Sequence, residues 1–316
     1  MALKLLIILG FGLAALVGVT FWAAARHEAK AERDYPPDGQ LLNVDGMQVH
    51  AVVMGQGPDL VLIHGASGST RDMTFRLAPA LAERYRVIVI DRPGFGYTDR
   101  LEGDETIARQ ATLLMDAARR LGAERPLVLG HSYGGAVALA WAVNHPDHLS
   151  GLVALSAASQ VWDGSLPMLY RVTSTWAGQT LVVPLITAYV PDRVVARAVE
   201  EVFEPQEEPE GYAGYFGPSL TLRRVTMRTN AVQRANLLGE IRAQVGRYGE
   251  ISVPTEIVHG AADTTVGLSI HAEKLVNQIP GAVLSALPGI GHMPHHAAMP
   301  EVIAAIDRVA QRAGLR

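Results

Sequence analysis

The chain has 316 residues, of which 49% are hydrophobic and 18% charged, and its formal net charge is −4. This share of apolar side chains excludes a disordered or fibrous protein, and the lack of cysteine excludes disulfides, a cysteine-ligated zinc site and a thiol nucleophile. The mildly acidic balance predicts no nucleic-acid partner, and the length favours one large α/β domain over two small ones.

The N-terminus is strongly apolar. Residues Leu5–Ala25 form an uncharged run of 21 residues, with Lys4 before it and Arg26 after it. A helix of that length just spans a hydrocarbon core of about 30 Å. Residues 1–25 are therefore predicted to be an uncleaved, single-pass membrane anchor. A signal peptide cleaved at Ala23-Ala24-Ala25 and a buried core helix are the alternatives, and basic residues on both flanks leave the orientation open.

Residues 26–40 are charged and then rich in turn residues, which predicts a linker. From residue 41 onward, β-rich runs alternate with helical patterns. This alternation predicts a doubly wound, mostly parallel α/β sheet with helices on both faces. The expected strands are 47–53, 60–63, 87–90, 127–129, 152–155, 256–258 and 283–287, and the expected helices lie near 70–83, 104–122 and 133–145.

One long segment interrupts the alternation. Residues 160–250 contain helical patterns, prolines and many aromatic residues but no clear strand. The simplest interpretation is a helical cap over the carboxyl edge of the sheet, inserted between the core segments 41–159 and 251–316. Its aromatic residues either line a ligand pocket or pack the cap's own core, and Trp162 and Tyr170 are candidate substrate-binding residues.

The sequence Gly130-His131-Ser132-Tyr133-Gly134 follows a predicted strand and precedes a predicted helix. This is the G-x-S-x-G pattern in the context of strand, sharp turn and helix that it requires. The glycines are needed because the serine occupies a strained turn that side chains on either side would obstruct. The turn exposes the serine hydroxyl, and the helix N-terminus directs N–H groups at the site. Ser132 is therefore the candidate nucleophile.

Over about residues 40–313 the chain resembles the α/β-hydrolase fold family. Four further motifs carry the resemblance, in the family's order: His64-Gly65-Ala66-Ser67, the turn at 91–98, His259-Gly260-Ala261-Ala262-Asp263 and Gly289-Ile290-Gly291-His292. The resemblance implies a triad of Ser132, Asp263 and His292, with the backbone N–H groups of Ala66 and Tyr133 as oxyanion donors. The triad is complete without a bound cofactor.

Several neighbouring residues compete for these roles. Asp163, past the strand at 152–155, is the alternative acid, but Asp263 has the complete strand–glycine context. His295 and His296 crowd His292 and could suggest a metal. Because Pro294 interrupts them and no carboxylate stands at ligand spacing, we expect a surface or pocket-lining cluster and no metal. His131 is more typical of a structural hydrogen-bonding residue, although it could touch substrate.

The serine also constrains the reaction. Epoxide hydrolases and haloalkane dehalogenases, which the chain resembles overall, carry aspartate at this position, so displacement by a carboxylate is not expected here. Hydrolysis of a small-molecule carboxylic ester through an acyl-enzyme, with an apolar acyl group, is the leading hypothesis. C–C bond hydrolysis of a diketone-like substrate is the alternative, with Arg171, Arg223 and Arg224 as candidate carboxylate binders. A non-catalytic, membrane-tethered binding protein is the alternative from another class.

Overall fold

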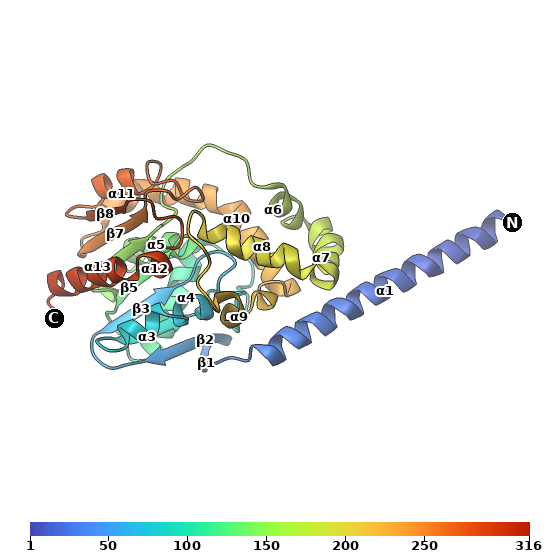
Figure 1. Ribbon diagram of the computed structural model, residues 1–316, viewed down its shortest axis with the longest axis horizontal. Helices are drawn as coiled ribbons and strands as arrows, with labels where there is room; N and C mark the ends of the chain where they lie inside the picture. The colour runs from blue at the N-terminus through green and yellow to red at the C-terminus, as the bar shows by residue number, and fades with distance from the viewer.

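A computed structural model describes residues 1–316: an α/β body with a helical cap, from which one long helix projects (Figure 1). The body is built on one eight-stranded sheet in the order β1-β2-β4-β3-β5-β6-β7-β8. All neighbours from β4 to β8 in this order pair in parallel, whereas β1–β2 and β2–β4 pair antiparallel. The predicted doubly wound, mostly parallel sheet is thus confirmed. The strands are β1 Gln40–Val44, β2 Met47–Met54, β3 Asp59–Ile63, β4 Arg86–Ile90, β5 Leu127–His131, β6 Gly151–Leu155, β7 Thr255–Gly260 and β8 Val283–Leu287.

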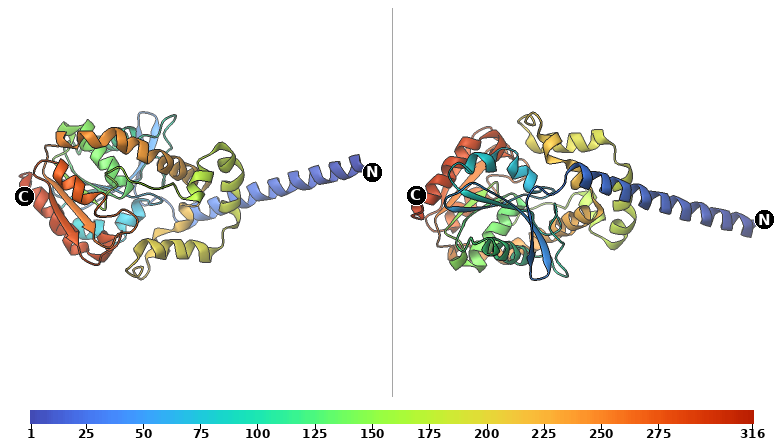
Figure 2. Two further views of the ribbon diagram at one scale, coloured as in Figure 1. Left: turned by 90° about the horizontal axis from the view of Figure 1, so that it is seen from above. Right: turned by 90° about the horizontal axis from the view of Figure 1, so that it is seen from below.

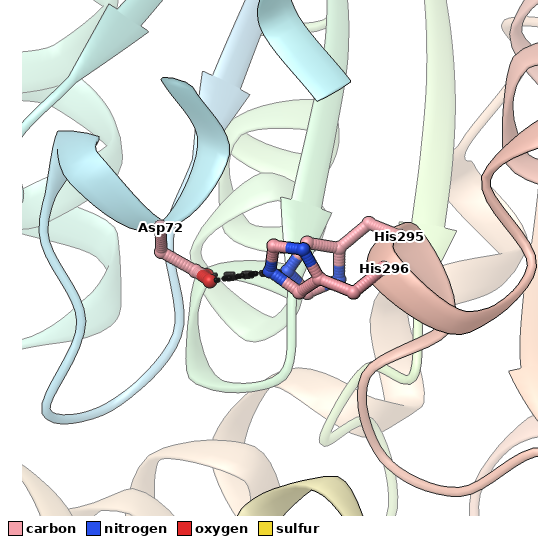
Figure 3. A group of neighbouring side chains, drawn as sticks. All are labelled: Asp72, His295 and His296. Atoms are coloured by element: carbon pink, nitrogen blue, oxygen red, sulfur yellow. Dashed lines mark hydrogen bonds and ion pairs between the residues drawn. The ribbon is translucent and has the colours of Figure 1, made fainter. Parts of the chain in front are cut away.

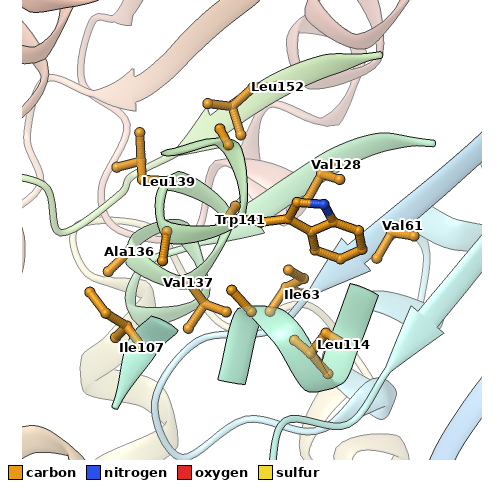
Figure 4. Packing of buried hydrophobic residues seen from close by; sticks show 14 of the residues in the cluster. Val61, Ile63, Ile107, Leu114, Val128, Ala136, Val137, Leu139, Trp141 and Leu152 are labelled. Atoms are coloured by element: carbon orange, nitrogen blue, oxygen red, sulfur yellow. The ribbon is translucent and has the colours of Figure 1, made fainter. Parts of the chain in front are cut away.

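Helices cover both faces of the sheet because alternate strand residues point to opposite sides. In β3, Val61 and Ile63 pack toward α4 and α5, whereas Leu60 and Leu62 pack toward α3 and α13. Figure 4 shows the side of the sheet that α4 and α5 cover, with Trp141 of α5 lying among strand residues. The body's helices are α2 Thr70–Thr74, α3 Leu77–Leu81, α4 Ile107–Arg120, α5 Tyr133–Asn144, η1 Pro146–His148, α11 Ala272–Gln278, α12 Pro294–Ala297 and α13 Met299–Arg312.

Two features of the body differ from the sequence-based expectation. The helix expected near 70–83 is two short helices, because Pro79 has no N–H to donate to Phe75 and its ring would collide with that carbonyl. The strand β1 was not expected. It pairs with β2 through a two-residue turn in which Asp45 and Gly46 both have positive φ, 50° and 92°, as a type I′ hairpin requires.

The N-terminal helix, α1, runs from Ala2 to Asp34, so most of the expected linker 26–40 is helical. Alanine, glutamate, lysine and arginine in this stretch favour a helix, and Lys30 pairs with Asp34 four residues on. The stretch is also held by the cap, since Glu28 pairs with Arg224 at 2.6 Å and Glu32 with Arg223 at 3.1 Å. The irregular connection between α1 and the sheet is therefore short, from the end of α1 to the start of β1.

The cap lies over the carboxyl ends of the parallel strands and meets α1 where that helix leaves the body (Figure 2). Its regular elements are all helices and it contains no strand, as expected for residues 160–250. Tyr189 of α7 hydrogen-bonds to Thr20 of α1 at 3.2 Å. The elements of the cap are α6 Met168–Thr173, η2 Gly178–Val182, α7 Val183–Tyr189, α8 Asp192–Phe203, α9 Tyr212–Phe216, η3 Pro218–Leu220, α10 Arg224–Gln244 and η4 Val245–Glu250.

Candidate active site

Ser132 occupies the turn between β5 and α5 with φ 54° and ψ −117°, a conformation that costs about 1–3 kcal/mol for a residue with a side chain. The flanking glycines make this turn possible. A Cβ at Gly130 would lie 2.2 Å from the carbonyl oxygen of Gly134, and one at Gly134 would lie 2.4 Å from that of His64. Both positions are therefore closed to any side chain, and the serine is held at the strand's end.

Gly134→Ala is expected to destabilise the protein by about 3 kcal/mol or more, because the new methyl group meets backbone atoms of Ile63 and His64 at the end of β3, which cannot move aside. Gly239→Ala is the matched control. It lies in α10 with open space around it, so the same change should stabilise the protein by roughly 0.5–1 kcal/mol. Denaturant unfolding of both variants measures the difference, and a Gly134→Ala variant as stable as wild type would contradict this description of the turn.

The structure brings Ser132, His292 and Asp263 into one hydrogen-bonded row. The serine Oγ lies 3.0 Å from Nε2 of His292, and Nδ1 of the same ring lies 2.7 Å from Oδ2 of Asp263. The other carboxylate oxygen of Asp263 accepts the N–H groups of Thr265 and Val266, each at 2.8 Å. With the proton on Nδ1, the imidazole donates to Asp263 and offers Nε2 to the serine hydroxyl. Asp163 lies exposed in the loop after β6, away from this row.

The environment keeps Asp263 ionised. Burial acts to raise the pKa of this carboxyl, but hydrogen bonds from His259 and His292 outweigh it and hold the pKa below its usual range. An anionic Asp263 fixes the tautomer of His292 and stabilises a positive charge on its ring.

The loop after β3 lies against the serine turn. A Cβ at Gly65 would lie 3.2 Å from the Cβ of Ser132, so the loop reaches the serine only because residue 65 has no side chain. The backbone N–H groups of Ala66 and Tyr133 have no acceptor within the protein. These two donors are free to bind an oxygen atom beside Ser132.

Buried polar residues hold the loop in place. Arg92 is fully buried and donates to the carbonyl oxygens of His64 and Gly65, each at 3.1 Å. Nε2 of His64 accepts the N–H of Arg92, and burial lowers the pKa of His64 to about 4, so this ring is neutral and structural. Asp91 accepts N–H groups from Thr70 and Tyr97, which stabilises its own turn.

A cavity of about 590 Å³ opens above Ser132 and His292, between the body and the cap helices α6, α7, α8 and α10. Just over half of its lining residues are hydrophobic. Tyr170 and His131 line it, as considered from the sequence. Trp162 does not, because it packs against the core of the body, with its ring tilted against that of His271 at a centroid distance of 5.9 Å.

The cap arginines selected from the sequence lie elsewhere. Arg223 and Arg224 face α1, where they pair with Glu32 and Glu28, and Arg223 also donates to the carbonyl oxygen of Gly96. Arg171 contacts Met168 within its own helix. The basic cap residue that does line the cavity is Arg234, which sequence reasoning missed. Arg234 stands four residues after Asn230 in a long helix, and this spacing, which places both on one face, could have identified it.

A second polar cluster lies in the cavity wall (Figure 3). Asp72 of α2 accepts from Nε2 of His295 at 3.2 Å, from Nε2 of His296 at 2.9 Å and from the Tyr212 hydroxyl at 2.9 Å. The sequence suggested no carboxylate near the two histidines because Asp72 lies more than 220 positions away in the chain. Burial acts to raise the pKa of Asp72, but the hydrogen bonds from the two histidines hold it well below its usual range.

Asp72, His295 and His296 have the composition of a two-histidine, one-carboxylate metal site, and their ligand atoms lie within 4.8 Å of one another. A histidine that binds a metal normally donates its other ring N–H to a carboxylate or carbonyl. Here Nδ1 of both His295 and His296 is buried without a partner. The cluster is better explained as a buried carboxylate that three donors stabilise, which also fixes α12 against α2.

Comparison with known proteins identifies the family. Residues 58–297 match the family model described as the alpha/beta hydrolase fold. The chain belongs to the α/β-hydrolase fold family. The resemblance inferred from the motifs is thereby confirmed. Among sequence relatives of this hydrolase, an uncharacterised protein of Mycobacterium tuberculosis is 26% identical over 280 residues, which cover 83% of this chain and 77% of the relative.

Two further comparisons cover very different shares of the hydrolase. A pimeloyl-[acyl-carrier protein] methyl ester esterase of Aeromonas hydrophila is 36% identical over 126 residues, or 38% of this chain and 48% of the esterase. A solved structure described as a bacterial membrane phospholipase A has a TM-score of 0.66 and 20% identity and covers 98% of both chains. This likeness shows a shared fold.

Proposed function

We propose that this α/β hydrolase is a serine hydrolase that cleaves carboxylic esters with apolar acyl groups. Ser132 is the nucleophile, His292 the general base and Asp263 the residue that orients it. The observation that carries the proposal is the row of hydrogen bonds from Asp263 through His292 to Ser132 at the floor of a largely apolar cavity.

The geometry supports a two-step mechanism. Ser132 Oγ attacks the ester carbonyl carbon while Nε2 of His292 takes the hydroxyl proton. The carbonyl electron pair moves onto oxygen, where the N–H groups of Ala66 and Tyr133 stabilise the charge, each donor contributing about 3–4 kcal/mol. The intermediate collapses, and the leaving alcohol takes the proton from His292. Water then attacks the acyl-enzyme by the same route and releases the acid.

The cavity lining supports an apolar acyl group. Side chains from three cap helices, among them Leu169, Ile186 and Val194, lie opposite the loop after β3. Burial of each methylene group of a substrate against such a surface contributes about 0.8 kcal/mol. The partial similarity to a pimeloyl-[acyl-carrier protein] methyl ester esterase supports ester hydrolysis.

We further propose that α1 is an uncleaved membrane anchor. The helix has an 18-residue window of mean hydropathy 2.4 with no buried residues. Ala24, within the candidate cleavage site, is fully buried, and α1 contacts α7 and η3 of the cap, so cleavage there would remove packed contacts. Next to α1, the cap exposes Trp176, Leu181 and Leu185, which are 80%, 62% and 48% exposed. Exposed apolar residues beside an anchor are typical of a surface that meets lipid, so substrates with lipid-like acyl chains fit this location.

The test is a rate profile with 4-nitrophenyl esters of increasing acyl length, measured on the full chain in detergent. We expect kcat/KM to rise with acyl length to an optimum, because each added methylene is buried until the cavity is filled. A fluorophosphonate probe should label Ser132 in parallel. Labelling without ester turnover would favour C–C hydrolysis or acyl transfer to another alcohol, and absence of both would leave the binding-protein alternative.

A further inference from the structure

The cavity contains one cation that no acid of the protein neutralises. Its formally charged lining residues are Asp72, Glu201 and Arg234. The three donors described above surround Asp72. Glu201 pairs with Arg197 at 2.7 Å on the exposed side of α8. The Arg234 side chain forms no ion pair and no hydrogen bond with another residue, so its charge lies in the cavity wall without a partner.

The Arg234 side chain is nevertheless held in place. It is partly buried, and its guanidinium carbon lies 4.2 Å from the centre of the Tyr170 ring. A guanidinium group over an aromatic face is attracted by the ring electrons and keeps its N–H groups at the edge, available to an acceptor. A partly buried charge without a partner carries a desolvation cost, which an anionic ligand would offset.

The position of Arg234 relates it to the reacting atoms. Met227, Asn230 and Arg234 line the cavity from one face of α10, as their spacing of three and four residues requires. Asn230 exchanges two hydrogen bonds with Ser67, at 2.9 and 3.2 Å, and Ser67 follows Ala66 directly. The arginine thus lies one helical turn, about 6 Å along the axis, from the contact between the cap and the oxyanion loop.

We propose that Arg234, stacked on Tyr170, is an anion-binding subsite, and that the preferred esters carry a carboxylate or phosphate group a few bonds from the scissile carbonyl. This inference rests on the proposed ester hydrolysis and specifies its substrate class. The guanidinium binds either anion through paired N–H···O bonds, while the apolar lining takes the rest of the molecule.

The kinetic test compares anionic and neutral esters of matched size on the full chain in detergent. The carboxylate pair is 4-nitrophenyl hydrogen adipate and 4-nitrophenyl heptanoate, and the phosphate pair is 1-hexanoylglycerol 3-phosphate and 1-hexanoylglycerol. In Arg234→Gln, kcat/KM for the anionic member of at least one pair should fall about tenfold to a hundredfold relative to its neutral partner. The pair that responds identifies which anion the site takes.

Two variants separate recognition from structure. Arg242→Gln removes the same charge from an exposed position on the same helix and should leave both ratios unchanged. Arg234→Lys keeps the charge without the planar fork and should retain part of the preference. If Arg234 only fixes α6 to α10, Arg234→Gln will slow anionic and neutral esters equally, and the proposal is overturned.

A binding measurement keeps this inference separate from the proposed function. Calorimetric titration of hexyl phosphate, heptanoate and heptanol does not depend on turnover. We expect at least one of the two anions to bind more tightly than the alcohol to wild type, and that advantage to disappear in Arg234→Gln. This result with no ester turnover would preserve the anion site and reject the esterase. Equal binding of anions and alcohol by wild type would reject the site even if Ser132-dependent hydrolysis is found.

Discussion

Ser132→Ala is expected to reduce kcat for ester hydrolysis by a factor on the order of 10⁶, because the hydroxyl hydrogen-bonded to Nε2 of His292 is the one removed. The oxyanion donors and the cavity remain, so weak binding of substrate should persist. The measurement is steady-state hydrolysis of the optimal 4-nitrophenyl ester, with fluorophosphonate labelling of the same sample.

The variant should fold as the wild type does. Alanine keeps the Cβ and therefore the same backbone strain, and the hydroxyl removed has His292 as its hydrogen-bond partner. A thermal melt within a few degrees of wild type serves as the control. Turnover close to the wild-type rate in a well-folded Ser132→Ala protein would reject the assignment of the nucleophile.

Asp263→Asn should lower kcat by about 10⁴-fold while leaving KM little changed. The asparagine oxygen can still accept the N–H groups of Thr265 and Val266, which directs its NH₂ group at His292. The ring then carries its proton on Nε2 and cannot accept the proton of the Ser132 hydroxyl. The defect is therefore one of tautomer rather than of fold.

Asp163→Asn is the matched control, because it makes the same chemical change in the exposed loop after β6. Its kcat should equal that of wild type.

A pH–rate profile adds a second readout. The environment holds the pKa of Asp263 below its usual range, so Asp263 should contribute its carboxylate throughout the profile above its usual pKa and lose that contribution only as pH falls toward the lowered value. A large loss in Asp163→Asn with little in Asp263→Asn would reverse the assignment of the acid.

The sequence predicts those parts of the site that depend on short, local sequence patterns. Ser132, Asp263 and His292 each follow a strand at a glycine-containing turn, and parallel strands bring such turns to one edge of the sheet. The strands themselves are recognisable because both faces are buried, which requires continuous β-branched and leucine-rich runs. Local pattern and overall topology agree at these positions.

The remaining features depend on residues distant in sequence. Asp72 becomes the partner of His295 and His296 only when α2 packs beside α12. Arg234 is distinguished from the other cap arginines by its place in the cavity wall, which no sequence pattern records. Trp162 was selected as an aromatic cap residue, but the path of the chain after β6 packs it beside His271.

The two ion pairs between α1 and the cap make this N-terminal helix part of the architecture of the hydrolase. Glu28 and Glu32 supply the countercharges of Arg224 and of the largely buried Arg223, which also holds the turn at Gly96. A shortened, water-soluble version beginning after Asp34 would leave both guanidinium groups without these partners and uncover the face of α7 that α1 contacts. The cap of this fragment would lack contacts that hold it in the full chain. The contacts of α1 with the cap therefore favour the full chain for measurements on the cavity.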